Sequence, residues 1–291
     1  MYKVAILGTG KMGSAMAREL SSAGAEIALW NRSRQKAEDL ALELANPLVK
    51  VAATVAEAFL DTDIAICAFT DGKVTQNVLL SDPKLLELAE SRLIIVDMGT
   101  SGVESAKYLD QEITKAGLRF VDAPVSGSVA TIAAHQLLVM ASGSPDGVEE
   151  IRPVLDIFAK KVAYLGHAGS GQALKLSVNL IVHSLNAAVS EALALATSVG
   201  ISASDVYDVF EESVIAAPFV KYKRSAFLDG KTPVAMRMDT VVKDMGLIRN
   251  FGASTAVPLN AAWAVEDLYR HACAAGFEAS DMASLVRYLK P

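Results

Sequence analysis

Three polar side chains recur at intervals of four in an otherwise apolar stretch of the 291-residue chain. Lys175, Asn179 and His183 lie in the sequence GSGQALKLSVNLIVHSLNAAVSEALALA, residues 169–196. In a helix this spacing places all three on one face. A partly buried lysine ammonium can stabilise a developing oxyanion and donate its proton, and an asparagine amide can orient a polar ligand. Lys175 and Asn179 are therefore candidate functional residues, although a lysine near the start of a helix can also extend to solvent. His183, like most lone inward-facing histidines, is predicted to be a packing residue.

A second chemical signal is a glycine pattern at the start of the chain. The sequence GTGKMG directly follows the apolar run YKVAILG and opens the helical pattern MGSAMARELSSAG. In this strand–turn–helix context, glycines allow a tight turn and close approach of the backbone to a pyrophosphate, and the helix N-terminus favours the anion. The pattern predicts a dinucleotide site formed by Gly8, Gly10, Lys11, Met12 and Gly13.

The end of the second predicted strand indicates which dinucleotide binds. NAD enzymes usually place an acidic residue there, which binds the ribose hydroxyls. Here the strand EIALW ends in Asn31, Arg32 and Ser33, followed by Arg34. Guanidinium groups suit a 2′-phosphate, although a solvated basic helix start has the same composition. We predict that the site prefers NADP(H) and that NAD(H) binding is possible.

Hydrophobic patterns divide the chain into two parts. Up to about residue 165, short apolar runs alternate with helical patterns over 12–24, 33–44, 55–62, 83–89, 103–117 and 145–159. This alternation is typical of right-handed βαβ units. Beyond it only helical patterns occur, over 170–199, 203–213, 217–225, 239–253 and 258–276. We predict an α/β fold class: a Rossmann-type doubly wound parallel sheet in residues 1–165, and an all-helical domain in residues 166–291 joined to it by a long interdomain helix.

Composition excludes several classes of partner. The net charge of −6 and the absence of charge blocks argue against nucleic acid, and no cysteine or histidine spacing predicts a metal site. Polar residues interrupt the most apolar segment, 174–199, which argues against a membrane span. We expect a cytoplasmic protein with no membrane partner. The helical half is more apolar than its size requires, so it should form a homo-oligomer, either a dimer or a tetramer.

A third candidate segment lies at the end of another predicted strand. Ser126 and Gly127 follow Pro124 in DAPVSG, at the carboxyl end of a strand, where open α/β sheets bind ligands. The hydroxyls of Ser126 and Ser128 and the exposed backbone N–H groups there suit a carboxylate. A polar turn with no ligand is the alternative.

Taken together, four segments resemble the β-hydroxyacid dehydrogenase family over nearly the whole chain. They are GTGKMG, DAPVSG, GSGQALKLSVN and the pair Lys243-Asp244. The family includes 3-hydroxyisobutyrate dehydrogenases and glyoxylate/succinic semialdehyde reductases. The resemblance implies that Lys175 is the catalytic residue, that Asn179 orients the substrate and that Ser126 and Gly127 bind it. It also implies cofactor contacts from residues Thr70, Thr100 and Lys243, and a structural role for Asp244.

The chain departs from the family pattern near the substrate segment. Ser128 stands where relatives commonly have a second glycine, and His135-Gln136 replaces a frequent Gly-Thr pair. We count Ser128 and His135 as candidate substrate-binding residues. Because of these departures, the identity of the substrate is left open.

The expected reaction is hydride transfer between a nicotinamide and a small carbonyl or hydroxy compound, with Lys175 managing the proton. Three alternatives remain. An imine reductase shares this architecture, but such enzymes usually carry another residue in place of the lysine. A non-catalytic NADP-binding sensor or interaction module would need neither Lys175 nor Asn179. For a decarboxylating enzyme of the 6-phosphogluconate type, the helical domain is short.

Overall fold

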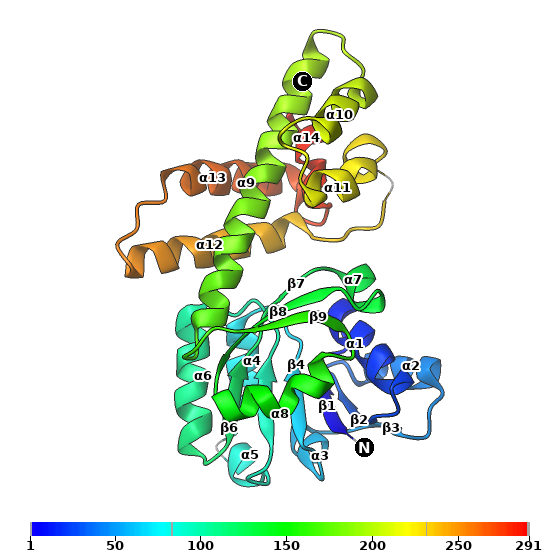
Figure 1. The fold of residues 1–291 in the computed structure, drawn as a ribbon, viewed down its shortest axis with the longest axis vertical. Helices are drawn as coiled ribbons and strands as arrows, with labels where there is room; N and C mark the ends of the chain where they lie inside the picture. Colours follow the sequence, from blue (N-terminus) through cyan, green and yellow to red (C-terminus); the bar gives the residue numbers. More distant parts are fainter. Residues whose placement is uncertain (1, 83, 231, 290–291) are drawn as a thin grey trace. The chain divides into compact units, whose positions relative to one another are not determined.

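The computed structural model describes residues 2–82, 84–230 and 232–289, which form two compact units, Met1–Lys175 and Leu176–Pro291. The first unit is a sheet covered by helices, and the second consists of helices (Figure 1). Helix α9 (Ser170–Ser198) begins in the first unit and continues through the second. The predicted fold class is confirmed. The predicted domain boundary after residue 165 precedes α9, whereas the division into units falls within this helix.

The sheet of the first unit has the order β3-β2-β1-β4-β5-β6-β8-β7, with β9 beside β8. Strands β1 to β6 pair in parallel, as the alternating pattern predicts, while β8 runs antiparallel to β6 and β7 and parallel to β9. The carboxyl ends of β1, β4 and β5 therefore meet at one edge, where ligands bind in such sheets. The strands are β1 (Lys3–Leu7), β2 (Glu26–Trp30), β3 (Val49–Val51), β4 (Ile64–Cys67), β5 (Ile94–Asp97), β6 (Arg119–Asp122), β7 (Val125–Ser126), β8 (Leu137–Gly143) and β9 (Ala159–Tyr164).

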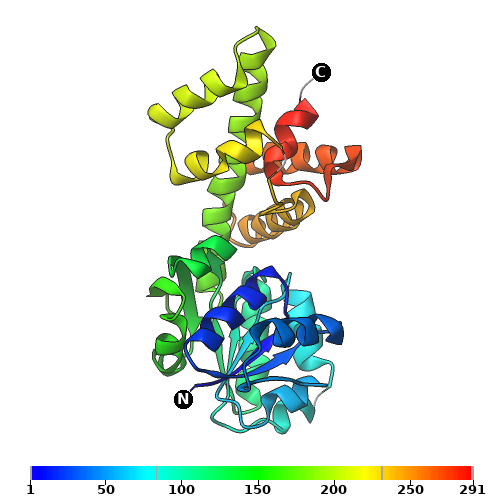
Figure 2. The ribbon, with the colours of Figure 1, turned by 90° about the vertical axis from the view of Figure 1, so that its right-hand side faces the viewer.

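Helices cover both faces of this sheet because successive strand residues point to opposite sides. In β1, Val4 and Ile6 belong to one buried cluster and Ala5 and Leu7 to another. Figure 2 shows helices on both sides of the sheet. The first cluster is completed by α1 (Lys11–Ser22), α2 (Arg34–Leu44) and α8 (Pro145–Leu155), and the second by α3 (Val55–Phe59), α4 (Gly72–Leu80), α5 (Lys84–Glu87) and α6 (Val103–Lys115).

Two short helices of the first unit were not predicted. Helix α4 is capped by Asp71, whose carboxylate accepts a hydrogen bond from Val74 N at 3.0 Å, and α7 (Val129–Ala133) follows the substrate segment. A further helix was predicted to begin near Pro83, a residue outside the described ranges; α5 begins at the next position. These helices are only nine and five residues long, so each offers a short stretch of helical pattern and the cap is the clearer signal.

The second unit packs its helices around α9. All five predicted helical ranges correspond to observed helices, and no glycine or proline interrupts α9 between Gln172 and Ser198. Its core contains Leu193 of α9 with Tyr207, Val220 and Phe227. The helices after α9 are α10 (Ala203–Glu212), α11 (Pro218–Leu228), α12 (Met238–Ser254), α13 (Asn260–Ala272) and α14 (Leu285–Leu289), with shorter turns at Cys273–Phe277 and Met282–Ser284.

One face of α9 carries a buried polar row. The row comprises Gln172, Lys175, Asn179, His183, Asn186 and Ser190. By length and composition alone α9 could cross a membrane, since an 18-residue window of it has a mean hydropathy of 1.4. Of that window, 33% is buried within the structure. Buried helices of globular proteins meet the same criterion.

Candidate active site

The glycine loop joins β1 to α1 and is closely packed at two of its three glycines. Gly8 has φ +99°, and a Cβ on Gly13 would lie 2.0 Å from Gly8 O, so both positions require glycine. At Gly10, by contrast, a Cβ would meet nothing within 4 Å. Gly10 therefore leaves an open approach to the first turn of α1, where backbone N–H groups face outward.

The polar atoms around this loop fit a phosphate. Thr9 Oγ1 is buried and has no hydrogen-bond partner among the described residues, so it is available to a ligand. Asn31 Oδ1 accepts a hydrogen bond from Thr9 N at 3.1 Å, and Asn31 Nδ2 donates to Ser33 O at 3.0 Å. The predicted residues Asn31 and Ser33 thus fix the loop to the end of β2. The remaining loop residues, Lys11 and Met12, are exposed and half-buried respectively.

The two arginines after β2 differ in their contacts. Arg34 Nε donates to Glu38 Oε1 at 2.8 Å, one helical turn away. Arg32 is exposed, and no ion pair to it occurs in the described part of the chain. Arg32 is therefore the guanidinium that is open to an anionic ligand at the end of β2.

The start of α9 is anchored by a buried carboxylate. Asp122 Oδ2, at the end of β6, accepts hydrogen bonds from Gly169 N and Gln172 N, each at 3.2 Å, and from Ser142 Oγ at 2.8 Å. Ser142 Oγ in turn accepts from Gly171 N at 2.9 Å. Burial raises the pKa of Asp122 to about 6, against the lowering effect of these donors. The N-terminus of α9 is thus tied to β6 and β8.

Gln172 extends this anchor to the loop after β5. Its Nε2 donates to Asp122 Oδ1 at 2.8 Å and to Gly99 O at 3.0 Å, while its Oε1 accepts from Ser101 N and Gly102 N. Its side chain is fully buried. The loop that contains Thr100 is therefore held to α9 by one glutamine amide. The sequence prediction missed Gln172, although it continues the polar row one turn before Lys175.

Lys175 follows this anchor by one helical turn and is only 8% exposed. A lysine at that depth must have polar or charged surroundings, since an ammonium group cannot be buried alone. The substrate segment belongs to the same unit: Ser126 is the last residue of β7 and half-buried, and Gly127 has φ +147°. A Cβ on Gly127 would lie 2.2 Å from Thr131 Oγ1, so this turn also requires glycine.

The two residues that depart from the family pattern have contacts of their own. Ser128 is the N-cap of α7, and its N–H donates to Thr131 Oγ1 at 2.6 Å. His135, at φ +56°, places Nε2 3.3 Å from Glu19 Oε2 of α1. The His135 imidazole thus contacts α1. The role of His135 in substrate binding stays a prediction.

Asn179 and Lys243 converge on one carboxylate in the second unit. Asn179 Nδ2 donates to Asp244 Oδ2 at 2.8 Å, and Lys243 Nζ lies 2.9 Å from Asp244 Oδ1. Burial by itself would raise the pKa of Asp244, but contacts from His183 and Lys243 outweigh it and lower the pKa to about 2. Asp244 is therefore an anion that orients both predicted residues.

The two predicted threonines follow neighbouring strands. Thr70 is exposed after β4, with its Oγ1 3.3 Å from Asp71 Oδ2, and Thr100 is half-buried after β5. Both lie beyond carboxyl ends of the parallel sheet, as a cofactor site requires. Across residues 2–82, 84–230 and 232–289, no group of three His, Cys, Asp or Glu side chains could hold a metal ion.

Comparison with known families assigns both parts of the chain. Residues 3–166 match the NAD binding domain of 6-phosphogluconate dehydrogenase, and residues 169–289 match the NAD-binding domain of NADP-dependent 3-hydroxyisobutyrate dehydrogenase. The chain belongs to the β-hydroxyacid dehydrogenase family. As a member of this family it is an NAD(P)-dependent dehydrogenase or reductase.

Individual relatives cover the full length. Glyoxylate/succinic semialdehyde reductase 1 of Arabidopsis thaliana is 30% identical over 288 residues, which are 99% of this chain and 98% of the relative. The structure of 3-hydroxyisobutyrate dehydrogenase from Salmonella typhimurium has a TM-score of 0.89 at 26% identity and covers 99% of this chain and 100% of that one. An imine reductase from Pseudomonas sp., at 24% identity and a TM-score of 0.68 over 99% of each chain, shares the fold.

The open space at Gly10 gives a test of the dinucleotide site. Gly10→Ala should leave the melting temperature of the free protein unchanged, because its φ of −75° suits alanine and the Cβ meets nothing. It should weaken dinucleotide binding on the order of tenfold or more, since the methyl group occupies the pyrophosphate approach. Calorimetric titration with NADPH and with NADH measures this.

Gly13→Ala is the matched control, because its Cβ would collide with Gly8 O in the free protein. It should lower the melting temperature as well as the affinity. Unchanged dinucleotide affinity in a folded Gly10→Ala protein would contradict the placement of the pyrophosphate at this loop.

Proposed function

We propose that this family member is an NADPH-preferring reductase of small carbonyl compounds that bear a carboxylate, with Lys175 as the general acid and base. The observation that carries the proposal is the burial of Lys175, which is only 8% exposed. It lies one turn after the start of α9, which Asp122 and Gln172 hold in place. The anchored helix fixes the backbone of Lys175, which is what orientation of a proton donor requires.

The residues of the chain supply binding, orientation and a proton. When bound, the cofactor supplies a hydride to the carbonyl carbon. The Gly8–Gly13 loop and Thr9 Oγ1 would hold its phosphates. Lys175 Nζ would stabilise the negative charge that develops on the carbonyl oxygen and transfer a proton to it, and in the opposite direction would accept that proton. Asn179, one turn further along α9, would hold the reacting group by hydrogen bonds.

A carboxylate on the substrate is supported by the Ser126–Gly127 segment. The Ser126 hydroxyl and the N–H groups of this glycine turn are donors at the carboxyl end of the sheet. The Arabidopsis relative is named for glyoxylate and succinic semialdehyde, both carboxylate-bearing aldehydes. Candidate substrates are therefore small semialdehydes and 2-oxoacids.

Substitution of Lys175 tests the chemical role. Lys175→Met should lower kcat about 10²- to 10⁴-fold, the usual contribution of a general acid, while the dissociation constant for NADPH changes little. Steady-state kinetics with a panel of semialdehydes, 2-oxoacids and cyclic imines measures kcat, and titration measures binding.

Lys107→Met, which alters an exposed lysine on α6, is the control and should keep full activity. Near-wild-type kcat in Lys175→Met would overturn the proposed mechanism. Turnover of cyclic imines but of no carbonyl compound would favour an imine reductase instead.

Arg32 tests the preference for NADPH. Arg32→Ala should weaken NADPH binding about 10- to 100-fold, the value of one charge-assisted hydrogen bond to the 2′-phosphate, and should leave NADH binding nearly unchanged. Arg34→Ala, which removes an arginine already bonded to Glu38, should affect neither cofactor. Equal losses for NADPH and NADH in Arg32→Ala would contradict the preference.

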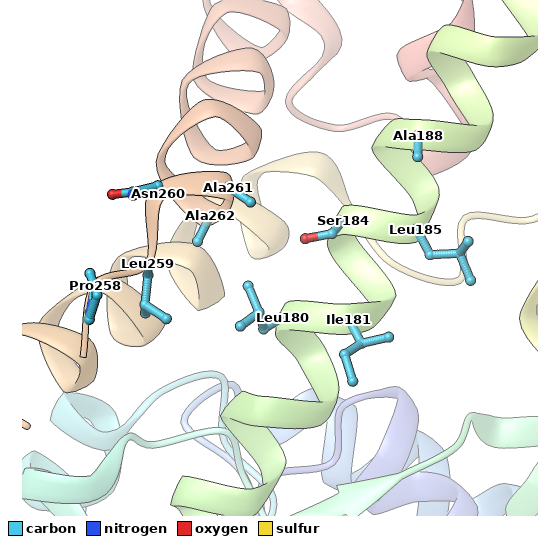
Figure 3. Close-up of a pocket in the computed structure, with 10 residues that line it drawn as sticks. All are labelled: Leu180, Ile181, Ser184, Leu185, Ala188, Pro258, Leu259, Asn260, Ala261 and Ala262. Atoms are coloured by element: carbon cyan, nitrogen blue, oxygen red, sulfur yellow. The ribbon is translucent and has the colours of Figure 1, made fainter.

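We also propose that the helical unit mediates homo-oligomerisation. On the outer face of α9, Leu174, Ile181, Ala188 and Leu195 recur every seven residues, a spacing that suits pairing with another helix. Ile181 and Leu195 are 68% and 74% exposed. An apolar groove lies beside this face, between α9 and the start of α13, lined by Leu180, Ile181, Leu185, Pro258 and Leu259 among others (Figure 3). A second copy of the chain presents the same self-complementary face.

Charged substitutions on this face of α9 test whether it mediates association. The wild-type protein should have at least twice the monomer mass by light scattering, and Ile181→Glu combined with Leu195→Glu should reduce it to the monomer, since buried carboxylates oppose association. Leu60→Glu, at an equally exposed leucine of the first unit, should leave the mass unchanged. A monomeric wild-type protein would overturn the proposal.

A further inference from the structure

His183 is a buried titratable side chain that the proposed mechanism does not use. It is fully buried on α9, one turn beyond Asn179. Neither of its ring nitrogens has a hydrogen-bond partner within the described ranges, and its one ionic contact runs from Nε2 to Asp244 Oδ2 at 3.5 Å. Burying an imidazole without strong hydrogen bonds costs stability, so packing alone does not explain why a histidine occupies this position.

The contact leads to the same carboxylate oxygen that binds Asn179. Asp244 Oδ2 receives Asn179 Nδ2 at 2.8 Å and faces His183 Nε2 at 3.5 Å, while Asp244 Oδ1 faces Lys243 Nζ at 2.9 Å. Three side chains therefore surround one buried anion. Asp244 Oδ2 contacts both the Asn179 amide and the His183 imidazole. Each contact therefore limits rotation of the Asp244 carboxylate.

The orientation of Asp244 decides the orientation of the Asn179 amide. An ionised carboxylate only accepts hydrogen bonds, so the NH₂ group of Asn179 must face it and the amide oxygen must point elsewhere. A carboxylate that rotated away from Asn179 would remove this constraint, and the amide could then present either its NH₂ group or its oxygen to a ligand.

We propose that His183 is a positioning residue: through Asp244 it holds the Asn179 amide in one orientation toward the reacting group. The inference rests on the proposed reductase function in so far as Asn179 contacts the substrate. The imidazole is fully buried and acts through the 3.5 Å contact between its Nε2 and Asp244 Oδ2. Lys243 restrains the other oxygen, so the imidazole and the ammonium together fix the plane of Asp244.

Two amide substitutions of different reach test the proposal. His183→Gln places an N–H group near the position of Nε2 and should retain kcat within a few-fold. His183→Asn is too short to reach Asp244 Oδ2 and should lower kcat roughly 10- to 100-fold, the cost of losing orientation of a catalytic group, with little change in KM for NADPH. Both variants keep a polar group at the buried position, so the comparison isolates contact with Asp244 from polarity.

Asn186→Ala is the structural control. Asn186 is buried one turn further along α9, but its Nδ2 bonds to Tyr269 Oη at 2.8 Å and to Met282 O at 2.9 Å, away from Asp244. This variant should lower the melting temperature and keep kcat. Loss of kcat in Asn186→Ala equal to that in His183→Asn would overturn the positioning role, because any buried polar loss on α9 would then have the same effect.

A second readout is independent of turnover. The side-chain ¹⁵N–¹H signals of Asn179, assigned by their loss in Asn179→Ala, should shift in His183→Asn and return toward the wild-type position in His183→Gln. Unshifted Asn179 signals in His183→Asn overturn the proposal. If the wild-type protein reduces no carbonyl compound, the proposed function fails, and these signals still decide whether His183 orients Asn179.

Discussion

The hydrogen bonds to the Asp122 carboxylate are the interaction on which the rest of the site depends. Two backbone N–H groups at the start of α9, the Ser142 hydroxyl and the Gln172 amide all donate to it. A carboxylate at a helix N-terminus also meets the positive end of the helix dipole. Because Gln172 in turn holds the backbone around Thr100, one buried acid at the end of β6 fixes both the helix that carries Lys175 and the loop after β5.

The contributions of two buried acids to folding stability depend on pH in opposite directions. The pKa of Asp122 is raised by burial to about 6, so ionisation of this group costs folding free energy, and its contribution to stability falls as pH rises from about 4 to 6. The pKa of Asp244 is lowered to about 2 despite burial, because His183 and Lys243 stabilise the anion. Its contribution is present above about pH 4 and is lost as pH falls toward 2.

Local sequence patterns predicted the helices and strands but not the hydrogen-bond partners that are distant in sequence. The glycine loop, the five helical ranges and the Lys175–Asn179 face follow from residues close together in sequence, and the structure places them on the expected elements. Asp122 and Gln172 are 50 residues apart, and no local pattern links them. The polar row of α9 did contain a signal, since Gln172 precedes Lys175 by one turn. His183 was predicted to be a packing residue; its burial fits that prediction, but its contact with Asp244 could not be read from the sequence.

The most direct test of the role of Asp122 is the single-turnover rate of NADPH oxidation by Asp122→Asn at saturating cofactor and substrate. The amplitude of the absorbance change reports the folded, active fraction, and the rate constant reports how well Lys175 is positioned. We predict a rate constant lower by roughly 10- to 100-fold in the molecules that react, because the amide cannot accept all the bonds that the carboxylate accepts. An unchanged rate constant with a reduced amplitude would mean that the Asp122 anchor serves stability alone, and would contradict its role in positioning Lys175.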